Sequence, residues 1–224
     1  TASTTIEIIH DLPGVIVYFS RRLYIVTKIF MMHKILIILF LYTASIGYIV
    51  AQELETGQKR WSTTHKLTVN DFKLDPPVSK QETAYSQFII AHKINAFDAM
   101  KRNLNQRVDN IFNGRGSWID TLNIENIEEA LGFQQLQFDL AEVQARKFRK
   151  QLLQNKGKIL GGFEIVNQIS DDIMAQFTEI RANMVTETDY GRNEEAVKLW
   201  EEKIATELKE LDQFRYENTK RIKL

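Results

Sequence analysis

The chain reads NIEEALGFQQLQFDLAEVQARKFRKQLLQN from Asn126 to Asn155. Its apolar residues recur about every 3.5 positions, which is the spacing of one helix face. They are Ile127, Leu131, Phe138, Ala141, Ala145, Phe148 and Leu152. Only Gln134 interrupts this stripe, and a buried amide needs hydrogen-bond partners. The pattern therefore predicts one long helix in which Gln134 requires an explanation.

Two further helices are predicted on the C-terminal side of this one. Gly157, Gly161 and Gly162 mark a break, and a helix over about 163–186 follows. One face of that helix carries Val166, Ile169, Ile173, Phe177, Ile180 and Met184. Gly191 marks a second break before a third helix. The third helix is lined by Ala196, Trp200, Ile204, Leu208 and Leu211.

Strand patterns lie on the N-terminal side of the long helix. Residues 61–72 indicate a short strand and a turn, and residues 83–97 are rich in aromatic and β-branched residues typical of a strand. Residues 107–118 predict another strand with a turn at Gly114-Arg115-Gly116. The expected fold class is α+β, with a small antiparallel sheet of two or three strands packed against three long helices.

The N-terminal residues have the pattern of a targeting segment. Residues 32–51 combine a basic start, an apolar run and small residues before Gln52, which predicts a secretory signal peptide. Residues 1–31 are expected to be a non-native upstream extension, and residues 52–60 a disordered start. Residues 61–219 would form one domain. The alternative is an uncleaved membrane anchor over residues 35–50.

Composition narrows the expected partners. The chain has 224 residues, of which 44% are hydrophobic and 26% charged, an ordinary globular balance. Its 29 basic and 29 acidic residues cancel, so nucleic acid is not an expected partner. No cysteine is present, which excludes disulfides and thiolate ligands or nucleophiles. An exported protein without disulfides fits a bacterial envelope, either the periplasm or the cell exterior.

Five short motifs, in order along the chain, carry a resemblance to a known family. They are Leu67-Thr-Val-Asn-Asp-Phe-Lys73, Ser117-Trp118, Phe138-Asp-Leu-Ala-Glu142, Glu187-Thr-Asp-Tyr-Gly191 and Trp200. In these motifs the chain resembles the bacterial family of predicted secreted zinc-dependent proteases, which is otherwise described as a domain of unknown function. The resemblance covers nearly all of the chain after the signal peptide and implies a zincin-like fold.

The residues that would perform the family's chemistry are replaced. Where the family has H-E-x-x-H, this chain has Phe133 and Gln137 at the two ligand positions and Gln134 at the position of the general base. Tyr190 stands where the resemblance implies a third ligand. A phenyl ring has no lone pair, and a neutral amide is a poor zinc ligand. The resemblance therefore implies a degenerate member without catalytic residues, metal or cofactor.

Three carboxylates survive from the family pattern. In an active relative, Asp139, Glu142 and Glu187 could support the metal ligands from behind. In this chain we expect Asp139 and Glu142 to cap, to pair with Arg146 or Arg149, or to face solvent.

The expected function is interaction without catalysis. The former cleft would bind a peptide or an envelope protein, or the domain would be a structural module, and the membrane would be met only through an uncleaved signal segment. The alternative is a metal-dependent hydrolase with a relocated site, in which Tyr190, Glu187 and Glu142 converge beside an open pocket. His65 and His92 lack partners at ligand spacing and are interpreted as surface or core histidines.

Overall fold

The computed structural model describes residues 54–78 and 82–224. The predicted upstream extension, signal peptide and alternative anchor, which together fall within residues 1–51, lie outside the described residues. Within the described part of the chain, no helix is both long enough and apolar enough to span a membrane.

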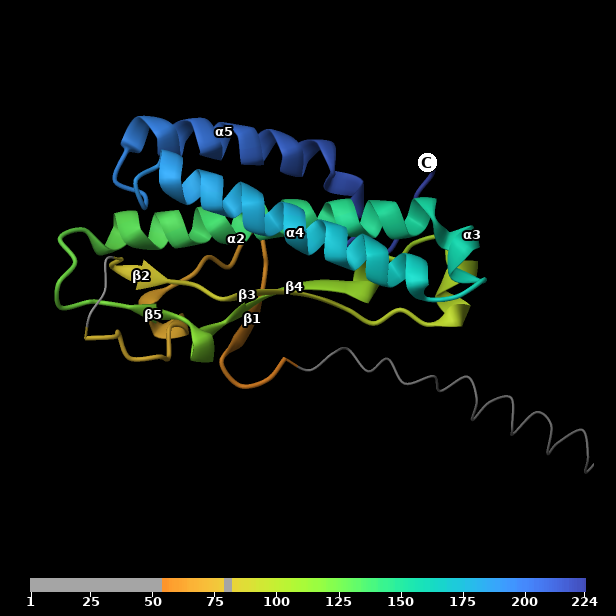
Figure 1. Ribbon diagram of the computed structural model, residues 1–224, viewed down its shortest axis with the longest axis horizontal. Coiled ribbons are helices and arrows are strands. Elements are labelled where there is room, and N and C mark those ends of the chain that lie inside the picture. Colours follow the sequence, from red (N-terminus) through yellow and green to blue (C-terminus); the bar gives the residue numbers. More distant parts are fainter. Residues whose placement is uncertain (1–53, 79–81) are drawn as a thin grey trace, which may run out of the picture. The chain divides into compact units, whose positions relative to one another are not determined.

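Two small antiparallel sheets form one layer of the domain (Figure 1). The larger sheet has the strand order β1-β4-β3, with β1 at Gln58–Arg60, β4 at Val108–Asn113 and β3 at Phe88–His92. The smaller sheet pairs β2, Ala84–Tyr85, with β5, Trp118–Ile119. Residues 108–112 of the central strand β4 are all buried. The predicted combination of a small antiparallel sheet with long helices is confirmed.

The strand predictions were only partly correct. The segment 83–97 is not one strand, because it divides into β2 and β3, which belong to different sheets. The break falls at Gln87, whose backbone N–H donates to the Ser117 hydroxyl at 2.9 Å. Residues 58–60, expected to be disordered, form β1, whereas the strand expected within 61–72 is absent and a 3₁₀ turn lies at Val69–Asp71. The turn predicted at 114–116 is confirmed.

The helices form the second layer. They are α2 at Ile127–Gln154, the short α3 at Lys156–Ile159, α4 at Glu164–Glu187 and α5 at Glu194–Glu210. Asparagine side chains start two of them, because Asn126 accepts from the Glu129 N–H and Asn193 accepts from the Ala196 N–H. The three predicted long helices are therefore confirmed, although Gly157 lies inside α3 and not in a break.

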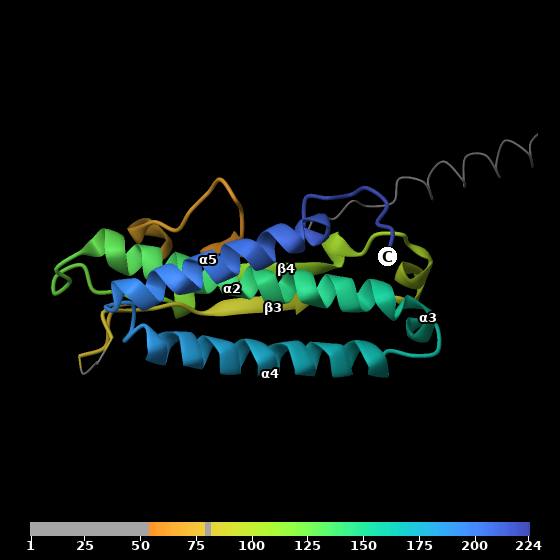
Figure 2. The same cartoon turned by 90° about the horizontal axis from the view of Figure 1, so that it is seen from above.

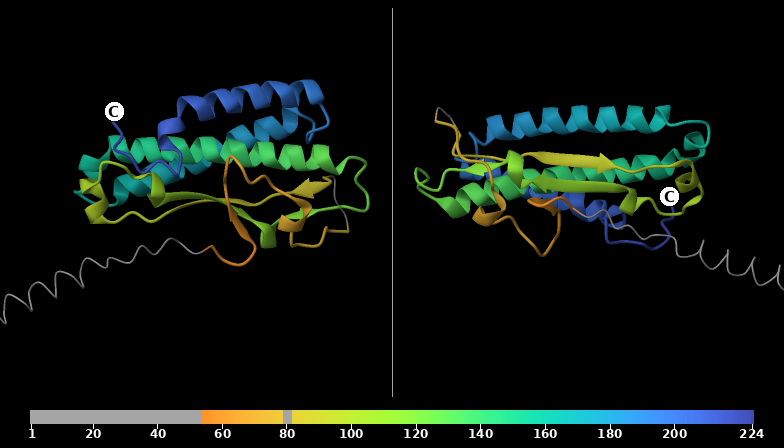
Figure 3. Two further views of the ribbon diagram at one scale, coloured as in Figure 1. Left: turned by 180° about the vertical axis from the view of Figure 1, so that it is seen from behind. Right: turned by 90° about the horizontal axis from the view of Figure 1, so that it is seen from below.

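Helix α2 occupies the centre of the domain. It packs on β3 and β4, while α4 and α5 lie along its other sides (Figure 2). In Figure 3, seen from below, the strands lie in front of the helices, and no helix of the described residues covers that face of the sheet. Helix α4 runs antiparallel to α2, and α5 runs in the same direction as α2 (Figure 1).

This central position corrects the prediction of one apolar stripe with a single interruption. Between Phe133 and Leu153 most side chains of α2 are buried, whichever way they point. The buried polar residues of α2 are Gln134, Gln137, Glu142, Gln144, Arg146 and Arg149. A helix enclosed on several sides has no solvent face on which to place its polar residues, so each needs a partner inside the protein.

The domain also extends beyond its predicted end at residue 219. The Ile222 side chain is buried, and its backbone N–H donates to the Arg102 carbonyl at 3.2 Å. The C-terminal residues are thus held against the rest of the domain.

Candidate functional site

The four positions that the resemblance assigns to a metal motif line one cavity. Phe133, Gln134 and Gln137 contribute from the first half of α2, and Tyr190 contributes from the turn after α4. The cavity has a volume of about 470 Å³, which lies within the range of small-molecule sites. Its other walls come from residues 82–85 and from the second half of α4. Residues of α2 and of the turn after α4, which are distant in the sequence, therefore meet at this cavity.

The turn after α4 is built to approach α2 closely. Asp189, Tyr190 and Gly191 have φ of 48°, 58° and 93°, a left-handed run that is uncommon for residues other than glycine. A Cβ on Gly191 would lie 2.6 Å from Cγ of Phe133, so only glycine fits there. The turn is held by the Tyr190 N–H, which donates to the Val185 carbonyl at 2.9 Å. This geometry places Tyr190 beside position 133.

The floor of the cavity consists of Gln134, Gln137 and Arg181, an arginine that was not among the predicted site residues. Arg181 of α4 donates from Nε to Oε1 of Gln137 at 2.8 Å and from a terminal nitrogen to the Ser86 carbonyl at 2.9 Å. Gln137 in turn donates from Nε2 to Oε1 of Gln134 at 3.2 Å. The amide predicted to need an explanation, Gln134, is thus one end of a chain of hydrogen bonds that starts at Arg181.

The surroundings of Arg181 are largely aromatic. Its guanidinium carbon lies 5.2 Å from the ring centroid of Phe88 and 5.7 Å from that of Tyr85. Burial lowers the pKa of Arg181, and the neighbouring Tyr85 and Glu82 act in the opposite direction. An arginine nonetheless keeps its proton in proteins, so a positive charge lies beside Gln137.

The three surviving carboxylates lie elsewhere, because none of them lines this cavity. Asp139 accepts from Nε1 of Trp61 at 2.6 Å and from Nε2 of Gln135 at 2.7 Å. Glu187 accepts from Nε1 of Trp200 at 2.9 Å. Asp139 and Glu187 therefore each accept a hydrogen bond from a tryptophan, and Glu142 belongs to an ion cluster.

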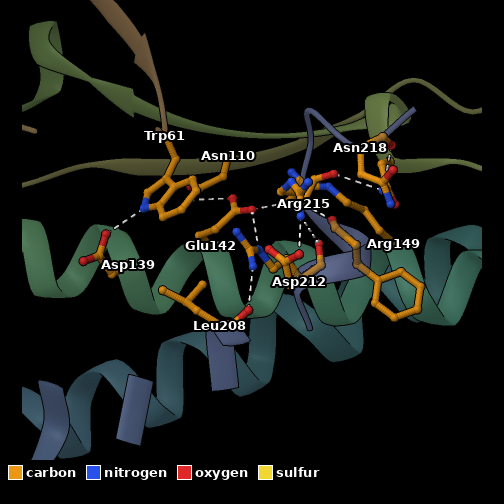
Figure 4. Close-up of polar contacts among 12 residues, drawn as sticks. Trp61, Asn110, Asp139, Glu142, Arg149, Leu208, Asp212, Arg215 and Asn218 are labelled. Atoms are coloured by element: carbon orange, nitrogen blue, oxygen red, sulfur yellow. Dashed lines mark hydrogen bonds and ion pairs between the residues drawn. The ribbon is translucent and has the colours of Figure 1, made fainter. Parts of the chain in front are cut away.

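Glu142 is the centre of a buried ion cluster on α2. Its Oε1 accepts from Nε of Arg146 at 3.0 Å and from Nη1 of Arg149 at 2.8 Å, which is one of the three outcomes that the sequence left open (Figure 4). Its Oε2 lies 3.5 Å from Nδ2 of Asn110 on β4. The three ionic side chains are at most 3% exposed. One carboxylate thus balances two buried guanidinium groups only in part.

Backbone carbonyls satisfy the rest of this cluster. Arg149 donates from Nη2 to the Val108 carbonyl at 2.9 Å and from Nη1 to the Phe214 carbonyl at 3.0 Å, while Arg146 donates to the Leu208 carbonyl at 2.6 Å. Leu208 belongs to the last turn of α5, where a cation is favoured. The cluster therefore joins α2 to the sheet, to α5 and to the C-terminal segment, and its arrangement is structural (Figure 4).

The relocated metal site of the alternative hypothesis is not assembled in the structure. Tyr190 lines the cavity, Glu187 is bonded to Trp200, and Glu142 belongs to the ion cluster. Among the described residues, no group of three or more His, Asp or Glu side chains is close enough together to hold a metal ion.

The two histidines lie in ordinary core and surface environments, as expected. His92 ends β3, and its ring lies 5.4 Å from that of Phe148 in an edge-on contact. Burial lowers the pKa of His92. His65 is exposed and lies within hydrogen-bond distance of the Thr64 hydroxyl, at 3.0 Å.

A sequence signal for Arg181 existed. It lies four residues after Phe177 on the apolar face of α4, so a helical projection places a charge where burial is expected.

Comparison of the chain with models of protein families, with curated proteins and with solved structures gives no match. The resemblance therefore depends on the short sequence motifs alone.

Proposed function

We propose that this protein is a non-catalytic relative of secreted zinc-dependent peptidases, exported to the periplasm or the cell exterior. Its cavity would bind a peptide or a segment of an envelope protein without cleaving it. The observation that carries the proposal is the meeting of Phe133, Gln134, Gln137 and Tyr190 at one cavity. Three of these positions lie within one turn of α2, so the informative part is that Tyr190 joins them from the turn after α4.

The chemistry of the cavity supports binding over hydrolysis. Zinc-dependent hydrolysis needs imidazole or carboxylate ligands and a carboxylate base that takes a proton from the bound water. Phe133 supplies carbon only, and the oxygen of Gln137 already accepts from Arg181. A guanidinium group this close also repels a divalent cation.

The arrangement of the elements supports a zincin-like ancestry. A long helix carries the motif positions 133, 134 and 137 and lies against a small antiparallel sheet, and the fourth position follows the next long helix. This is the order of sites that the resemblance implies.

A peptide panel tests the proposed function. The purified protein is titrated calorimetrically with N-acetylated tripeptides that differ in the last residue, and each mixture is then checked for cleavage by mass spectrometry with and without added zinc. We expect some members to bind and none to be cut. Cleavage that a chelator stops, or a panel in which no member binds, would contradict the proposal.

A variant that restores the zinc ligands tests whether the protein descends from a zinc-binding ancestor. The variant with Phe133→His, Gln134→Glu, Gln137→His and Tyr190→His should bind one equivalent of zinc, because the four positions share a cavity. Adding Arg181→Met should tighten zinc binding by about tenfold or more, since it removes the neighbouring cation. Calorimetry gives both affinities.

The matched control places a similar histidine pair elsewhere. Lys198 and Glu202 are exposed and four residues apart on α5, so Lys198→His with Glu202→His gives the same spacing without a third ligand. If the folded restored variant, verified by circular dichroism, binds zinc no better than this control, the ancestry is refuted.

A further inference from the structure

The direction of the hydrogen bonds on the cavity floor is fixed by Arg181. A guanidinium group only donates, so the atom of Gln137 that faces Arg181 Nε must be the amide oxygen. The nitrogen of Gln137 then donates to Gln134, whose oxygen is the acceptor. No flip of either amide preserves both bonds. The free end of this series of hydrogen bonds is therefore a donor, the Nε2 of Gln134.

One donor on this floor remains without a partner. Gln134 is 4% exposed, and its Nε2 makes no hydrogen bond within the described residues, although the side chain lines the cavity. Arg181 donates to Gln137 and to the Ser86 carbonyl and also bonds to the Tyr85 side chain, and its positive charge lines the same cavity. A floor with a free donor and a positive charge selects an acceptor, and most strongly an acceptor with negative charge.

The charges around the cavity also favour an anionic ligand. No carboxylate of the described residues lies within ion-pair distance of Arg181, whose bonds go to Gln137, to the Ser86 carbonyl and to the Tyr85 side chain, although the charge of Glu82 acts on it from farther away. The other lining cation, Arg192, is paired with Asp189 at 2.7 Å and faces solvent. Glu82 is the one lining carboxylate. A partly buried guanidinium group with no carboxylate in direct contact is stabilised by an incoming anion.

Part of the wall beside the floor is apolar. This part includes Phe133 and Phe177, together with Val185. Tyr85 and Tyr190, which are 40% and 39% exposed, stand where the cavity meets solvent. A fitting ligand therefore combines a negative acceptor with an apolar group close to it.

We propose that the cavity binds the C-terminal end of a peptide, with the terminal carboxylate on Arg181 and Gln134 and an apolar last side chain against Phe133 and Phe177. A terminal residue carries both groups on one Cα, whereas the interior of a peptide offers no backbone charge. The loss of the zinc ligands has thus changed a site for a cation into a site for an anion. This inference rests on the proposed function and names its ligand.

Two peptides that differ in one group test the inference without any variant. N-acetyl-Ala-Ala-Phe is titrated calorimetrically as the free acid and as the C-terminal amide. We expect the acid to bind about tenfold to a hundredfold more tightly, as for a hydrogen bond to a charged group. N-acetyl-phenylalanine, with the same end but no chain, should bind more weakly than the tripeptide acid. Equal binding of the single amino acid would instead identify a small carboxylate as the ligand and overturn the peptide assignment.

Two variants then test the assigned groups. Arg181→Met should abolish the preference for the acid, and Gln134→Glu should weaken binding of the acid by about tenfold or more, because it places a carboxylate at the free donor. Lys198→Met, which removes an exposed cation of α5 outside the cavity, should leave the preference unchanged. If Arg181→Met does not fold, Gln134→Glu and the wild-type comparison still decide.

The failures of the two proposals are distinguishable. Equal binding of acid and amide would overturn the inference while the proposed peptide binding stands. A panel in which neither form of any peptide binds would overturn both. In the bound state, the side-chain amide signals of Gln134 and the Nε signal of Arg181 should shift in nitrogen–proton correlation spectra with the acid. Unchanged signals at saturation would contradict the assigned contacts.

Discussion

Replacement of Glu142 by glutamine removes one charge from the centre of the protein without changing the shape of the side chain. In the native cluster this carboxylate, which is 1% exposed, accepts from Arg146 and Arg149. Breaking a buried pair on one side leaves an uncompensated charge and costs roughly 3–5 kcal/mol. Here two guanidinium groups would be left, so we expect the cost in unfolding free energy to fall within that range.

Thermal and urea unfolding measure this cost. For a domain of this size, each kcal/mol lowers the melting temperature by about 2–4 °C, which predicts a fall of roughly 6–20 °C for Glu142→Gln. The matched control is Glu201→Gln on the exposed face of α5, which should change the melting temperature little. A Glu142→Gln protein that melts within 1 °C of the wild type would refute the role assigned to the cluster. So would a variant of unchanged stability that loses peptide binding, because that would place Glu142 in the site.

Three further predictions concern the frame around the site. Gly191→Ala should destabilise the protein by more than about 1 kcal/mol in urea unfolding, because the residue has a positive φ and its new Cβ would contact Phe133. Gly132→Ala, whose Cβ meets nothing within 4 Å, should instead stabilise the protein by up to about 1 kcal/mol. The opposite order of stabilities would contradict the turn geometry. Burial lowers the pKa of His92, so its neutral form favours folding, and stability should fall as the pH drops from about 6.5 through the lowered pKa of the folded state. His92→Gln should flatten that pH dependence of the unfolding free energy, and an unchanged slope would show that another group causes it. Asn126→Ala should cost about 1 kcal/mol by removing the cap of α2, and no loss in urea unfolding would show that the cap is not needed.

The long helices could be predicted from the sequence because their apolar spacing is a local property. The face of α4 from Val166 to Met184 is buried as predicted, and α2 begins directly after Asn126. The pairing of Glu142 with Arg146 and Arg149 was also foreseeable, since residues one or two turns apart lie on one side of a helix.

The sheet and the cavity floor depend on contacts between distant segments. The division of 83–97 into two strands follows from the bond between Gln87 and Ser117, which no local pattern records. The role of Arg181 depends on α4 lying against Gln137 and Ser86. The burial of polar residues on α2 follows from its enclosure by the sheet, α4 and α5. Periodicity alone would instead predict a helix with one solvent-exposed face.

The central proposal is that the former metal position now carries a donor floor and holds no zinc. Crystals of the protein soaked in a zinc salt and measured at the zinc absorption edge test this most directly. We predict no anomalous peak in the cavity and Arg181 Nε within hydrogen-bond distance of Gln137 Oε1. A peak coordinated among positions 133, 137 and 190, with Arg181 displaced, would contradict the account.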